Sequence, residues 1–100
     1  MPKTQSFEEF YAYYLAAHAN RWNRRLHLFG YLAGVVVAAA CVQAGWPLLA
    51  ILGVPVGLGV ALLGHRFIEK NDSVVFDRPI WTARADLRMF KEMLIGKLAF

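Results

Sequence analysis

Three histidines, His18, His27 and His65, are the residues of this 100-residue chain best suited to chemistry. A segment without Asp, Glu, Lys or Arg covers positions 26–64, and His27 and His65 stand at its two ends. Glu69 follows His65 by four residues, which is one turn if a helix continues there. Imidazole and carboxylate groups are ligands of iron, zinc and manganese, and two histidines with one carboxylate can hold non-haem Fe(II). These residue types therefore allow a metal site, although no His-Glu-x-x-His motif is present. Histidines that only form hydrogen bonds are the alternative.

The uncharged segment 26–64 must position these side chains. A membrane-spanning helix needs roughly 17–25 apolar residues. Gly45 and Pro47 divide the segment, because glycine and proline interrupt helices and proline favours a first helical turn. We therefore predict a membrane hairpin of two transmembrane helices, over 26–42 and 47–70. A soluble hairpin of buried helices is the alternative, since each half is short enough for it.

The distribution of positive charge predicts the orientation of this hairpin. All eleven Lys and Arg residues lie outside the connecting loop. By the positive-inside rule, both termini are expected in the cytoplasm. The net charge of +4 then indicates attraction to the anionic lipids of the bilayer. No basic, aromatic-rich motif points to nucleic acid, so we predict no nucleic-acid partner.

Amphipathic helices are predicted on both sides of the hairpin. Ser6 and Glu9 have the spacing of a capping box, and aromatic residues at helical spacing follow them. This predicts a helix over 7–19 with His18 on its aromatic side, where a hydrogen-bonded core histidine is the simplest interpretation. A second helix is predicted over 79–98. Asp86 lies beside its apolar stripe, so we expect Asp86 to have a buried partner.

The predicted topology brings the histidines together. A hairpin returns its second helix to the side from which the first began, so His27 and His65 should share one membrane depth. His18 arrives from the preceding helix. Ionisable groups that face inward at the ends of spanning helices are functional candidates. Small residues at Gly30-x-x-x-Gly34 and Gly53-x-x-x-Gly57 also allow the two hairpin helices to approach closely.

Several motifs together resemble the short bacterial branch of the Mpo-like family. The resemblance covers roughly residues 6–96. It rests on Phe10-Tyr11-x-Tyr13-Tyr14-Leu15-x-x-His18-x-Asn20, Arg24-Arg25-Leu26-His27-x-x-Gly30, Gly64-His65-x-Phe67-x-Glu69-Lys70-Asn71, Phe76-x-x-Pro79-x-Trp81 and Asp86-x-Arg88-Met89. The fungal member of this family is an endoplasmic-reticulum 2-hydroxy fatty acid dioxygenase. The sequence departs from many relatives at Asp72-Ser73, where they have Arg-Pro.

The resemblance implies an all-α, single-domain protein over residues 1–100, in the bacterial cytoplasmic membrane. It implies an Fe(II)-dependent enzyme of fatty-acid α-oxidation, which converts a long-chain 2-hydroxy fatty acid and O2 to an acid one carbon shorter. The catalytic, metal-binding histidines of the family correspond to His18, His27 and His65. The alternative function is a non-catalytic lipid-binding or assembly protein of the membrane, and either could form a homo-oligomer.

Further ligands and substrate contacts complete the prediction. Since the chain offers only three histidines, Glu69 or Asp86 would supply any additional metal ligand. Arg24, Arg25 and Arg66 are candidates for binding the substrate carboxylate, because guanidinium groups form charge-assisted hydrogen bonds with carboxylates. Membrane anchoring is the alternative role of these arginines.

Overall fold

The computed structural model describes residues 6–73 and 75–100, and all regular structure in these ranges is helical. The α-helices are α1 (Phe7–Ala17), α2 (Arg21–Gln43), α3 (Gly53–Gly64) and α4 (Pro79–Leu94). A 3-10 helix, η1 (Pro47–Leu52), leads into α3, and one π-helical turn, η2 (His65–Glu69), follows it. The predicted all-α class is confirmed.

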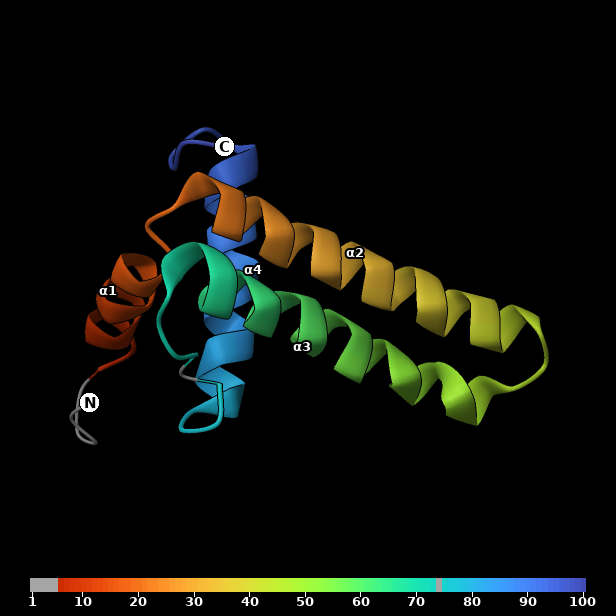
Figure 1. Ribbon diagram of the computed structural model, residues 1–100. Coiled ribbons are helices and arrows are strands. Elements are labelled where there is room, and N and C mark those ends of the chain that lie inside the picture. The colour runs from red at the N-terminus through yellow and green to blue at the C-terminus, as the bar shows by residue number, and fades with distance from the viewer. Residues whose placement is uncertain (1–5, 74) are drawn as a thin grey trace.

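The long element of the fold is a hairpin of α2 and α3, which run side by side (Figure 1). The segments Arg21–Gln43 and Pro47–Glu69 are each 23 residues long and apolar enough to span a membrane. Only 17% and 6% of their most apolar stretches are buried within the protein. A core helix of a soluble protein would be mostly covered, so this exposure favours the membrane hairpin over the soluble alternative.

Glycines set the distance between the two hairpin helices. A Cβ atom added to Gly34 would lie 2.6 Å from the carbonyl oxygen of Gly53. One added to Gly30 would lie 3.1 Å from the carbonyl oxygen of Gly57. The small-residue motifs thus pack against each other within one chain, because a larger side chain would force the backbones apart.

The packed core lies at the base of the hairpin, where α4 crosses it and α1 lies beside it (Figure 1). Phe10 and Tyr14 of α1 and Ala85 and Met89 of α4 are fully buried there. The predicted capping box is confirmed, since the Ser6 hydroxyl accepts a hydrogen bond from the backbone N–H of Glu9 and the Glu9 side chain accepts from that of Ser6. The core holds α1 and α4 against the end of the hairpin that carries the histidines.

The helix boundaries differ from the predicted ones for local reasons. Helix α2 begins at Arg21 rather than near 26, because the Asn20 side chain accepts a hydrogen bond from the N–H of Trp22 at 2.8 Å. Helix α1 ends at Ala17 instead of 19. The segment predicted as one helix over 47–70 contains three helix types and ends at Glu69. Helix α4 ends at Leu94 instead of 98, where Gly96 adopts a φ of 82°.

Candidate metal centre

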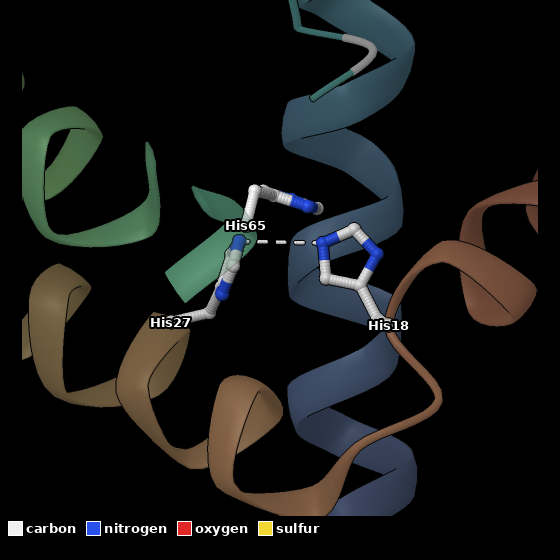
Figure 2. Close-up of side chains that lie close together, drawn as sticks. All are labelled: His18, His27 and His65. Carbon is white, nitrogen blue, oxygen red and sulfur yellow. Dashed lines mark hydrogen bonds between the residues drawn. The ribbon is translucent and has the colours of Figure 1, made fainter. Parts of the chain in front are cut away.

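The three histidines of the chain meet at the base of the hairpin (Figure 2). His18 is the C-terminal cap of α1, His27 lies in the second turn of α2, and His65 begins η2. One potential ligand atom from each lies within 4.8 Å of the others. The side chains are 2%, 3% and 2% exposed, respectively. The cluster is therefore removed from water.

Backbone carbonyls fix the tautomers of two of these rings. Nδ1 of His18 lies 2.7 Å from the carbonyl oxygen of Tyr14, and Nδ1 of His27 lies 2.9 Å from that of Asn23. A carbonyl oxygen can only accept, so each Nδ1 carries a proton and donates it. In a neutral ring the other nitrogen, Nε2, is then an unprotonated lone-pair donor. Burial and the neighbouring His27 lower the pKa of His18 to about 3, so His18 is neutral at physiological pH.

Asn71 fixes the tautomer of His65. The amide nitrogen of Asn71 donates to the carbonyl oxygen of Ala17 at 3.0 Å, which turns the amide oxygen towards His65. Nδ1 of His65 lies 2.7 Å from this oxygen and must donate to it. In a neutral ring, Nε2 of His65 is then an unprotonated lone-pair donor too. Asn71 also links the start of η2 to the end of α1, so it holds two of the three histidine-bearing segments together.

The π-helical turn brings Asn71 into this position. Its backbone N–H reaches back to the carbonyl oxygen of His65 at 2.9 Å. Lys70 is the C-terminal cap of η2 and directly precedes Asn71. It takes the left-handed conformation with a φ of 58°, which is uncommon for a residue other than glycine. Single π-helical turns occur often at functional sites. Here the turn brings Asn71 back to His65, the residue at which the turn begins.

The arrangement of the three Nε2 atoms fits a bound cation. Nε2 of His18 and Nε2 of His27 are 3.2 Å apart (Figure 2). Because both rings donate their Nδ1 protons to carbonyl oxygens, neither neutral ring has a proton on Nε2. The two Nε2 atoms therefore cannot form a hydrogen bond with each other. Nε2 of His65 is buried and has no hydrogen-bond partner among the described residues. A metal ion bound by the three lone pairs would satisfy all of them, and neutral imidazole is a preferred ligand of transition metals.

An apolar cavity of about 400 Å³ opens from the cluster. Its walls come from α2, α3, α4 and the segment before α4, and they are lined mainly by small and aliphatic side chains. The residues of the lining with polar side chains are His18, His27, Tyr31, His65, Ser73, Thr82 and Asp86. This volume falls in the range of small-molecule sites, which are mostly apolar with a few convergent polar groups.

A known protein family matches nearly the whole chain. A family model described as 2-hydroxy-palmitic acid dioxygenase Mpo1-like matches residues 4–98. The chain belongs to the Mpo1-like family. The resemblance predicted from the motifs is confirmed. No curated protein and no solved structure matches the chain. The family description and the histidine cluster together point to a metal-dependent, dioxygenase-like protein.

The two predicted carboxylates take different places in this Mpo1-like fold. Asp86 lines the cavity and accepts hydrogen bonds from the hydroxyls of Tyr14 and, at 2.6 Å, Tyr31. Its expected buried partners are thus two tyrosines. Burial raises the pKa of Asp86, although both hydrogen bonds oppose the shift. Glu69 accepts instead from the backbone N–H of Asn20 at 2.7 Å. Neither carboxylate belongs to the described ligand cluster, and their metal ligation stays a prediction.

The three predicted arginines lie outside the described cavity lining. Arg24 is buried and donates to the carbonyl oxygens of His18 and Ala19 at 3.0 and 2.8 Å, so it fixes the connection between α1 and α2. Arg25 donates to the carbonyl oxygen of Phe100 at 2.9 Å. Arg66 lies over the ring of Phe67. A role in substrate binding stays a prediction for all three.

Asparagines and tyrosines of the site were missed by reasoning from sequence. Asn71 and Asn23 orient His65 and His27, and Tyr14 and Tyr31 hold Asp86. The motif that contains Asn71 was a usable signal, because it places a polar residue directly after Glu69-Lys70. The tyrosine partners of Asp86 come from distant parts of the chain, so no spacing rule would have found them, and Asn23 acts through its backbone carbonyl, for which its residue type gives no signal.

Proposed function

We propose that this chain is a membrane-embedded, Fe(II)-dependent dioxygenase that converts a long-chain 2-hydroxy fatty acid and O2 to an acid one carbon shorter. The observation that carries the proposal is the meeting of three buried histidines, each with a potential ligand atom within 4.8 Å of the others, on the wall of an apolar cavity. Membership of the family described as 2-hydroxy-palmitic acid dioxygenase Mpo1-like supports the choice of reaction and substrate.

His18, His27 and His65 would hold the iron, which would supply open coordination positions for O2 and for the oxygens of the substrate. The chain itself keeps each imidazole in the metal-binding tautomer through Tyr14, Asn23 and Asn71, as described above. Such hydrogen bonds to the second ring nitrogen orient a ligand and raise its basicity. The site is therefore organised before metal and substrate arrive.

The cavity would bind the alkyl chain of the substrate. Its aliphatic walls follow the hairpin from Ala61 towards Ala50, away from the histidines, and so extend into the apolar part of the hairpin. Burial of the alkyl chain there is favourable at roughly 25 cal/mol for each Å² of apolar surface removed from water. The carboxylate of the substrate would remain at the histidine end of the cavity, where the iron would lie.

We further propose that the hairpin spans the bacterial cytoplasmic membrane with both termini in the cytoplasm. The uncharged loop between α2 and η1 supports this orientation, since all eleven Lys and Arg residues lie outside that loop in the sequence. The histidine cluster, at the base of the hairpin, would then lie near the cytoplasmic interface. A fatty acid could enter the cavity from the bilayer.

Oxygen uptake by the purified full-length chain tests the proposal. The protein, in detergent and supplied with Fe(II), should consume O2 with 2-hydroxypalmitic acid and release an acid one carbon shorter. Palmitic acid, which lacks the hydroxyl group, is the matched control and should give neither. If 2-hydroxypalmitic acid binds but is never converted, the dioxygenase proposal is wrong and a non-catalytic lipid-binding protein is the better account.

A further inference from the structure

Thr82 places a buried hydroxyl group in the cavity wall. It lies on α4 one turn before Asp86, lines the cavity, and is 6% exposed. Its Oγ1 atom makes no hydrogen bond within the part of the chain that the structure describes. Threonine in a helix commonly bonds its hydroxyl to a carbonyl in the preceding turn, and Thr82 does not.

An unpaired hydroxyl at this place destabilises the fold. A buried polar group without a hydrogen bond loses its interactions with water and gains nothing in return, whereas valine has the same shape without that cost. The carbonyl of Arg78, one turn earlier, already accepts the backbone N–H of Thr82 at 2.8 Å. The presence of threonine rather than valine at position 82 is therefore explained if its hydroxyl group binds a ligand in the cavity.

The surroundings of Thr82 select a neutral hydroxyl group as that ligand. Asp86, one turn away on the same face of α4, accepts from two tyrosines, so the carboxylate of a substrate would meet a like-charged group there. A substrate hydroxyl can both donate to and accept from Thr82. The remaining wall is mainly aliphatic and suits an alkyl chain.

We propose that Thr82 binds the 2-hydroxyl group of the fatty acid and thereby selects 2-hydroxy over unsubstituted fatty acids. This inference rests on the proposed function for its substrate class. A site that hydrogen-bonds a substrate hydroxyl discriminates against the analogue lacking it, because its own polar group is then left unpaired. Thr82 would thus be a specificity-determining residue.

Ligand binding without turnover tests this role. Dissociation constants for 2-hydroxypalmitic and palmitic acid are measured by displacement of a fluorescent fatty acid, with the purified full chain in detergent and O2 excluded. Wild type should prefer the 2-hydroxy acid. Thr82→Val should lower that preference about threefold to tenfold, as expected for one hydrogen bond. Thr82→Ser, which keeps a hydroxyl, should retain most of it. Tyr13→Phe, which removes an exposed hydroxyl from α1, is the control.

The inference is overturned if wild type shows no preference, or if Thr82→Val keeps the wild-type ratio. Thr82→Ala is a second variant without the hydroxyl and covers the case in which the valine variant does not fold. Iron content and O2 uptake of wild type are measured separately. If wild type binds iron and converts the substrate, but its preference for the 2-hydroxy acid does not depend on Thr82, only the role of Thr82 is refuted. A Thr82-dependent preference in a protein without turnover refutes the dioxygenase and leaves the hydroxyl site standing.

Discussion

Asn71 offers a sharp test of how the metal centre is organised. Replacing it with alanine removes the acceptor for Nδ1 of His65, at 2.7 Å, and the donor to the carbonyl oxygen of Ala17, at 3.0 Å. His65 could then adopt the other tautomer or rotate, because nothing else described holds its Nδ1. We expect metal affinity to fall while the hairpin still forms.

The expected magnitude follows from these two hydrogen bonds. Loss of a hydrogen-bonding partner of a metal-bound histidine typically costs about 10–100-fold in affinity. Each hydrogen bond is also worth roughly 0.5–1.5 kcal/mol of folding free energy, so Asn71→Ala should destabilise the fold by about 1–3 kcal/mol. Asn71→Asp keeps an acceptor for His65 but loses the donor to Ala17. It should keep wild-type metal affinity or exceed it, although the fold is still destabilised because an acceptor then faces the carbonyl oxygen of Ala17.

Competition with a chromophoric chelator, in detergent and without O2, measures these affinities. Denaturation of the same samples separates loss of metal binding from loss of folding. The reasoning is refuted if Asn71→Ala binds metal as tightly as wild type. It is also refuted if Asn71→Asp and Asn71→Ala are equally weak, because the acceptor at His65 would then have no effect.

Two further predictions concern stability. Gly34→Ala places a Cβ 2.6 Å from the carbonyl oxygen of Gly53 and should destabilise the hairpin by about 1–3 kcal/mol in detergent unfolding. The control is Gly59→Ala, whose Cβ meets no atom within 4 Å and should not destabilise the hairpin. Equal effects of the two variants would mean that the helices do not touch at Gly34. Burial alone would raise the pKa of Glu92, but hydrogen bonds from Tyr11 and Arg88 outweigh it and lower the pKa from 4.5. Its contribution to stability is therefore complete above pH 4.5 and is lost as the pH falls below it. Glu92→Gln should flatten this acid limb of the stability curve, and an unchanged limb would contradict the assignment.

The hairpin and the family could be predicted from sequence because their signals are strong and local. Nearly forty uncharged residues interrupted by Gly45 and Pro47 leave few alternatives to two apolar helices. The start of α2 was misplaced, since a cap such as Asn20 acts through a single side-chain contact that apolar patterning does not reveal. Helix ends that depend on one left-handed residue, such as Gly96, are equally hard to locate.

The site was less predictable than the fold. Hairpin topology is sufficient to bring His27 and His65 to the same end of the molecule. The tautomers of His18 and His27, however, depend on backbone carbonyl oxygens. The tautomer of His65 depends on the amide of Asn71, which the π-helical turn positions. Residue types contain no signal for such contacts. Asp86 could be recognised as partly buried, but its tyrosine partners lie 72 and 55 residues away in sequence.

The iron content of the purified protein tests the central claim most directly. Wild type, reconstituted with Fe(II) and passed through a desalting column without O2, should retain stoichiometric iron. His65→Gln should fold but retain none, because an amide preserves a hydrogen bond and not the imidazole lone pair. Cys41→Ala, with its substitution far along α2, should bind iron like wild type. Iron retained by His65→Gln, or absent from wild type, would contradict the account.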